Sequence, residues 1–111
     1  MSSVSTHVLD TAHGRPADGV AVRLYSGAGE LLYEGRTDDD GRCPGLRDVA
    51  VASGRYRLVF AVAAYFRARG ATLPEPPFLD EVAIDFGIAT DARYHVPLLV
   101  SPFGYSTYRG S

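Results

Sequence analysis

Hydrophobic residues alternate with polar or small residues along most of this chain, and this period of two limits the fold more than any other feature. Such alternation is typical of β-strands that bury one face in a core. Pro97 interrupts one such run, and because proline has no amide N–H we expect it at an edge or a bulge. The pattern predicts strands over residues 20–25, 56–62, 82–88 and 94–100, and more weakly over residues 4–9, 30–37 and 105–108.

Turn sequences rich in glycine and proline separate these strands. Residues 62–70 can form a helix that would end near Gly70, and residues 74–77 are expected to form a loop. A chain of 111 residues has the length of one domain. Seven or eight strands at this spacing predict an all-β fold, a two-sheet β-sandwich with one short helix, as a single domain over residues 1–111.

The composition excludes several classes of protein and of site. The formal net charge of −2 gives no basic excess for binding nucleic acid. No apolar run approaches the ~20 residues of a membrane-spanning helix, and the first residues do not read as a secretory signal, so we expect a cytoplasmic protein without membrane contact. The single cysteine, Cys43, excludes an intrachain disulfide and multi-cysteine metal sites. All 11 basic residues are arginine, which excludes catalysis by lysine.

Two of the three histidines lie in predicted strands, and the alternation places both on an outer face. His7 and His95 point away from the rows of valine and leucine that would face the core. Leu9 and Leu99 share these outer faces, and an apolar outer surface suggests that another subunit covers it. For each histidine, a surface or structurally hydrogen-bonded residue is the alternative interpretation.

Three other residues carry side chains that could take part in chemistry. His13 lies in a turn and is interpreted as structural. Residues 37–42 do not fit a calcium loop, because Arg42 and Cys43 occupy positions that need glycine and an acidic ligand. Arg42 follows this acidic turn, and its guanidinium is suited to a planar anion or a pair of carbonyls, an ordinary surface arginine being the alternative. Cys43 is expected to be a buried, inert thiol.

Both ends of the chain resemble the transthyretin-like family. The resemblance rests on residues 5–11 (STHVLDT) with the segments that follow to residue 25, and on residues 94–111. The last four residues, Tyr108, Arg109, Gly110 and Ser111, resemble the signature of the enzymatic branch, the 5-hydroxyisourate hydrolases. The sequence departs from the family pattern at residues 77–81 and at Arg93.

This resemblance implies an eight-stranded sandwich that forms a homotetramer, a dimer of dimers, with active sites between the dimers. It implies hydrolysis of 5-hydroxyisourate to 2-oxo-4-hydroxy-4-carboxy-5-ureidoimidazoline in urate degradation, without a metal or other cofactor. The implied catalytic residues are His7, Arg42, His95 and Ser111, and the implied substrate-binding residues are His7, Arg42, Tyr108, Arg109 and Gly110. Which histidine acts as the general base stays open.

Two other classes of function are alternatives to the enzyme. The first is a protein that binds or transports a small aromatic ligand, like the hormone-carrying branch of the same fold. The second is an adhesion or scaffold module. The joint presence of His7, Arg42, His95 and the closing tetrapeptide favours the enzyme, because a carrier does not need acid–base groups.

Overall fold

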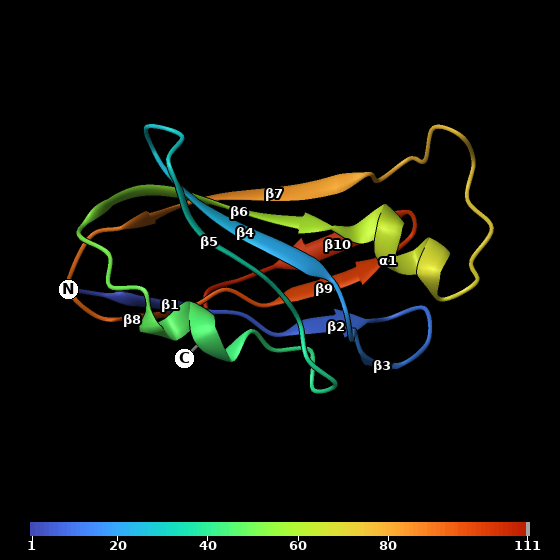
Figure 1. Ribbon diagram of the computed structural model, residues 1–111, viewed down its shortest axis with the longest axis horizontal. Helices are drawn as coiled ribbons and strands as arrows, with labels where there is room; N and C mark the ends of the chain where they lie inside the picture. Colours follow the sequence, from blue (N-terminus) through green and yellow to red (C-terminus); the bar gives the residue numbers. More distant parts are fainter. Residues whose placement is uncertain (111) are drawn as a thin grey trace.

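The computed structural model describes residues 1–110, and Ser111 lies outside the described residues. Two four-stranded sheets pack as a sandwich (Figure 1), which confirms the predicted all-β fold. One sheet has the order β5-β4-β6-β7 and the other the order β10-β9-β2-β3, while β1 and β8 form a short pair beside them. The strands are β1 (Ser3–Ser5), β2 (Val8–Asp10), β3 (Arg15–Pro16), β4 (Ala21–Ser26), β5 (Leu31–Arg36), β6 (Gly54–Ala61), β7 (Glu81–Ile88), β8 (Arg93–His95), β9 (Leu98–Ser101) and β10 (Gly104–Thr107).

Side chains of both sheets meet in one hydrophobic core. Val8 and Leu98 of one sheet and Leu24 and Phe60 of the other are fully buried within it. These residues belong to the rows that the alternation assigned to the core, so burial of one face explains why these segments form strands. In residues 1–110, no helix is long and apolar enough to cross a membrane.

Two short helices complete the fold. The α-helix α1 (Val62–Ala68) follows β6 directly, which confirms the helix predicted over residues 62–70. The 3₁₀-helix η1 (Pro44–Asp48) was not predicted from the sequence, although Pro44 occupies the first-turn position that proline favours. Leu46 of η1 is fully buried, which fixes this helix against the core. Figure 1 shows η1 beside β1 and α1 at the other end of the sandwich.

Two predicted strands are each divided in the structure. Residues 94–100 were expected to form one strand but form β8 and β9, and residues 4–9 form β1 and β2. Both breaks lie opposite each other, because β1 pairs in parallel with β8 and β2 in parallel with β9 in the same register. At the break, Pro97 has no amide N–H to donate to a neighbouring strand. On the opposite side, the hydroxyl of Thr6 donates to the carbonyl of Val96 at 2.7 Å. His95 therefore ends β8, and His7 lies between β1 and β2, directly before β2.

Candidate active site

The backbone around His7 places Arg42 beside it. The two residues form an isolated antiparallel bridge, and the amide of Val8 donates to the carbonyl of Gly41 at 2.8 Å. Gly41 has a φ of +76°, and a Cβ atom there would collide with the carbonyl oxygen of Val8. Only glycine therefore allows this turn to approach the strand so closely. The predicted Asp40-Gly41 turn thus brings the arginine that follows it to the first histidine.

His95 ends β8 directly opposite Ser5 of β1. Its Nδ1 atom lies 2.8 Å from the Ser5 hydroxyl oxygen, and its carbonyl accepts the amide of Gly110 at 2.8 Å. A Cβ atom on Gly110 would lie 2.5 Å from Cδ2 of His95, so the tail of the chain lies directly against this ring. The imidazole of His95 is therefore held from two sides.

The outer-face orientation predicted for both histidines is confirmed. Along residues 4–10, every second residue from Val4 is buried, whereas His7 and Leu9 are partly exposed. Leu98 is likewise buried while His95 and Leu99 are partly exposed. The Nε2 atom of His7 is itself buried and has no hydrogen-bond partner within residues 1–110. A buried polar atom without a hydrogen-bond partner needs an explanation, and a bound water or ligand would supply the partner.

The surroundings of His95 favour its neutral imidazole. Burial lowers the pKa of His95, and nearby Arg42, His7 and Arg47 lower it further. Each of these three side chains is therefore within electrostatic reach of His95. Arg47, from η1, was not identified from the sequence as a site residue, because the signal that brings η1 to β1 is not local.

Arg42 keeps hydrogen-bonding capacity at the site. Its Nε donates to Asp40 at 3.0 Å, and its side chain is 42% exposed. Within the described part of the chain, its other guanidinium N–H groups have no protein partner. They remain able to bind a carbonyl or an anion in a planar, two-point manner.

The closing residues do not all lie with the histidines. Gly110 touches His95, but the guanidinium of Arg109 stacks on the ring of Tyr94 at 4.2 Å, and Tyr94 points to the opposite face of β8. Tyr108 is 60% exposed. Tyr108 and Arg109 line a cavity of about 260 Å³ against β7. The substrate-binding roles assigned to these two residues stay predictions, and the catalytic role of Ser111 falls outside the described residues.

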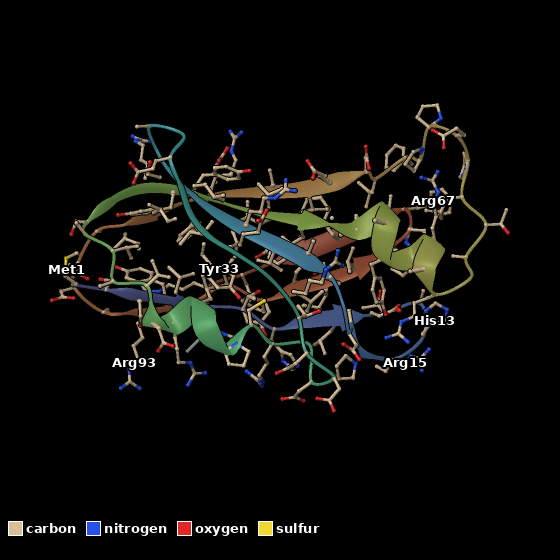
Figure 2. The ribbon with its side chains drawn as sticks, in the orientation of Figure 1. Met1, His13, Arg15, Tyr33, Arg67 and Arg93 are labelled. Atoms are coloured by element: carbon tan, nitrogen blue, oxygen red, sulfur yellow. The ribbon has the colours of Figure 1, made fainter. Side chains whose placement is uncertain are left out.

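The remaining candidates take structural positions. Cys43 is 4% exposed, and burial raises the pKa of its thiol, which fits the inert role predicted for it. His13 donates from Nδ1 to the carboxylate of Asp10 at 2.6 Å, and Tyr65 donates to the same carboxylate at 2.7 Å. Figure 2 shows His13 at the end of the molecule opposite Met1. No group of three or more metal-binding side chains occurs within residues 1–110.

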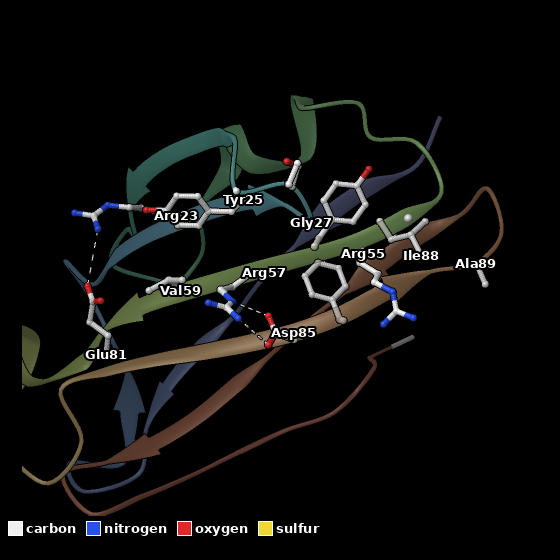
Figure 3. Close-up of a pocket in the computed structure, with 17 residues that line it drawn as sticks. Arg23, Tyr25, Gly27, Arg55, Arg57, Val59, Glu81, Asp85, Ile88 and Ala89 are labelled. Atoms are coloured by element: carbon white, nitrogen blue, oxygen red, sulfur yellow. Dashed lines mark hydrogen bonds and ion pairs between the residues drawn. The ribbon is translucent and has the colours of Figure 1, made fainter.

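A larger cavity, of about 1110 Å³, lies on the outer face of the sheet that contains β4, β6 and β7. Figure 3 shows two pairs of charged side chains there: Arg57 donates to Asp85 at 2.7 Å, and Arg23 lies 3.9 Å from Glu81. Neither His7 nor His95 lines it. Paired surface charges in an open depression offer no group prepared for acid–base chemistry, so the histidine site is the better candidate.

Several known proteins are similar to this chain in sequence and fold. The family model described as HIUase/Transthyretin family matches residues 4–110. A relative from Pseudomonas aeruginosa, named 5-hydroxyisourate hydrolase, is 52% identical over 117 residues, covering 100% of this chain and 93% of the relative. The structure of Klebsiella pneumoniae 5-hydroxyisourate hydrolase is similar with a TM-score of 0.88 and 39% identity, covering 100% of both chains. Sea bream transthyretin in complex with thyroxine is similar with a TM-score of 0.85 and 27% identity, covering 97% of this chain and 94% of that one.

Proposed function

Because this chain belongs to the HIUase/Transthyretin family, we propose that it hydrolyses its substrate at the site formed by His7, Arg42 and His95. The chain is an enzyme, and the reaction is the hydrolysis of 5-hydroxyisourate, the activity that names the P. aeruginosa and K. pneumoniae proteins. The observation that carries the site assignment is the buried Nε2 of His7, which has no hydrogen-bond partner within residues 1–110 and lies near a second imidazole and an arginine.

The reaction opens the six-membered ring of 5-hydroxyisourate at an amide-like bond between nitrogen and a carbonyl carbon. Water adds to the carbonyl carbon and loses a proton, the bond from carbon to nitrogen breaks, and the leaving nitrogen gains a proton. A neutral imidazole accepts the proton of the water and becomes an imidazolium, and the proton is then passed on to the leaving nitrogen. Such acid–base help is worth about 10²–10⁴-fold in rate.

Arg42 has a separate role in this proposal. The carbonyl oxygen of the substrate becomes negatively charged as water adds. The guanidinium N–H groups that have no partner in the described part of the chain would donate to this oxygen or to the neighbouring carbonyls. The ion pair with Asp40 holds Nε and so orients the guanidinium. Gly110 supports the site through His95, while Tyr108, Arg109 and Ser111 would close around the substrate ring.

The assembly is proposed to be a homotetramer in which two dimers cover the histidine face. Leu9 and Leu99 lie opposite each other in the parallel pair of β2 and β9, and both remain partly exposed on the face that carries His7 and His95. An apolar patch beside catalytic groups favours cover by a second copy. The cytoplasmic location expected from the sequence stays a prediction.

The activity is tested with 5-hydroxyisourate generated in the cuvette from urate by urate oxidase. The decay of its near-ultraviolet absorbance is followed with and without the protein. The wild type should accelerate the decay, and His7→Ala and His95→Ala should each lose about 10²-fold or more of kcat. His13→Ala is the matched control, because His13 contacts Asp10 rather than the site, and it should retain wild-type kcat.

Two results would contradict the proposal. Decay at the spontaneous rate in the presence of folded wild-type protein would contradict the enzymatic function. It would favour binding of a small ligand, as in the complex of sea bream transthyretin with thyroxine. Wild-type rates in folded His7→Ala and His95→Ala would keep the activity but move the site elsewhere.

A further inference from the structure

The hydroxyl of Ser5 lies within hydrogen-bond distance of the His95 ring. The proposed mechanism gives Ser5 no role. Ser5 and His95 are Cα partners in the parallel pair of β1 and β8. This register brings the serine Oγ to 2.8 Å from Nδ1 of the imidazole. Because the backbone of both strands fixes the pair, the contact does not depend on a flexible segment.

The hydroxyl of Ser5 has Nδ1 of His95 as its only hydrogen-bond partner within residues 1–110. The carbonyl of Ser5 is already used, since it accepts the amide of Val96 at 2.8 Å. A partly buried hydroxyl next to a neutral imidazole satisfies its proton best by donating to the ring nitrogen, which is the better acceptor of the two groups. The proton of the imidazole must then lie on Nε2, because a neutral ring carries only one.

We propose that Ser5 is a positioning residue that donates to Nδ1 of His95 and thereby fixes this histidine as the tautomer with its proton on Nε2. This inference rests on the proposed function and deepens it. His95 then offers its Nε2–H as a hydrogen-bond donor to the substrate and keeps this proton. His7, whose buried Nε2 has no hydrogen-bond partner within residues 1–110, is then the group that accepts the proton of the attacking water and passes it to the leaving nitrogen.

The surroundings of His95 support this division. Burial, Arg42, His7 and Arg47 all lower the pKa of the ring and so favour its neutral form, in which the tautomer decides which nitrogen can donate. Gly110 lies directly against Cδ2 of the same ring. Gly110 therefore packs against the imidazole, while Ser5 determines which ring nitrogen carries the proton.

Substitution of Ser5 tests the proposal, with Ser3→Ala as a matched control. Ser3 lies two residues earlier on the same face of β1, opposite Arg93, and is likewise partly buried. Ser5→Ala should lower kcat about tenfold with little change in KM, because one neutral hydrogen bond is lost from a group that acts in the chemical step. Ser5→Thr keeps the hydroxyl in a residue suited to strands and should restore kcat, while Ser3→Ala should behave as wild type.

A spectroscopic measurement separates positioning from a merely structural effect. Nitrogen-15 NMR of the imidazoles, assigned by comparison with His95→Gln, reports which ring nitrogen carries the proton. Wild type and Ser5→Thr should carry it on Nε2, and Ser5→Ala should show a mixture of both tautomers. A wild-type proton on Nδ1, or an unchanged kcat in Ser5→Ala, would overturn the proposal. Wild-type protein that does not hydrolyse 5-hydroxyisourate would instead contradict the proposed function, and the NMR result would still decide the tautomer.

Discussion

Gly110 lies so close to the imidazole of His95 that a Cβ atom at this position would be 2.5 Å from Cδ2 and 3.2 Å from Cβ of the histidine. The same glycine donates its amide to the carbonyl of His95 at 2.8 Å. The crowded atoms include Cβ, which the backbone of β8 holds in place, so a side chain at residue 110 has to displace the strand or the tail.

Gly110→Ala should therefore lower kcat about 100-fold, the size of loss expected when a catalytic group is misplaced by about 1 Å. Steady-state kinetics with 5-hydroxyisourate measure this effect. Gly104→Ala is the control, because a Cβ atom there would meet nothing closer than 3.9 Å. Wild-type kcat in Gly110→Ala would show that this contact does not position His95.

Arg47 offers a way to change the charge at His95 without removing a proposed catalytic group. The pKa of His95 is lowered by burial and then by Arg42, His7 and Arg47, so the neutral ring persists below the pH at which an ordinary histidine is protonated. Loss of one cation raises this pKa. Arg47→Gln should therefore move the acid limb of the profile of kcat/KM against pH to higher pH, with an unchanged plateau above it.

Arg93→Gln is the control for this pH profile. Arg93 is exposed on β8 two residues before His95, and it is not among the groups that lower the pKa of that histidine. Its profile should overlay that of the wild type. An acid limb that stays in place in Arg47→Gln would show that η1 does not influence the site electrostatically.

Local patterns were sufficient to predict most of the strands and the orientation of both histidines. His7 and His95 lie in alternating runs whose buried members are largely aliphatic, so parity alone placed them on an outer face. The Asp40-Gly41 turn is equally local, and Arg42 directly follows it. These features depend only on neighbours within a few residues, which is why they can be read from one sequence.

The contacts that assemble the site could not be read in this way. Parallel pairing of β1 with β8 joins segments at opposite ends of the chain, and alternation contains no information on which strands pair or in which register. The Ser5 contact with His95 and the stacking of Arg109 on Tyr94 both depend on that pairing. Pro97 did signal an irregularity, but the matching break between β1 and β2 follows only from the pairing of the two strands.

The buried carboxylate of Asp10 makes a separate prediction about stability. Burial would raise its pKa, but hydrogen bonds from Tyr65 and His13 outweigh this and leave the pKa below its ordinary value of 3.8. Tyr65→Phe removes one hydrogen-bond donor to Asp10, which is 1% exposed. The substitution should lower the free energy of unfolding by about 1–3 kcal/mol. Urea denaturation at pH 7 measures this loss.

The pH dependence of this loss has a defined sign. A carboxyl group with a lowered pKa in the folded state stabilises the protein above its unfolded pKa, and the stabilisation disappears as the pH falls through the folded value. The difference between Tyr65→Phe and wild type should therefore shrink in acid. Tyr105→Phe, at a 47% exposed side chain, is the control and should change stability little at any pH. A constant difference across the titration would show that Tyr65 acts through packing alone.

Leu99 tests the proposed assembly, because it is partly exposed beside His95 on the face that a second copy would cover. A charged side chain there would have to be buried without a partner on assembly, which is costly. Leu99→Glu should therefore dissociate the tetramer in sedimentation velocity experiments and lower activity, while the isolated subunit stays folded. Leu31→Glu, at a leucine that is 48% exposed on β5 of the other sheet, should leave the mass unchanged. A wild-type protein that sediments as a monomer at micromolar concentration would contradict the assembly, and a tetrameric Leu99→Glu would place its interface on a different face.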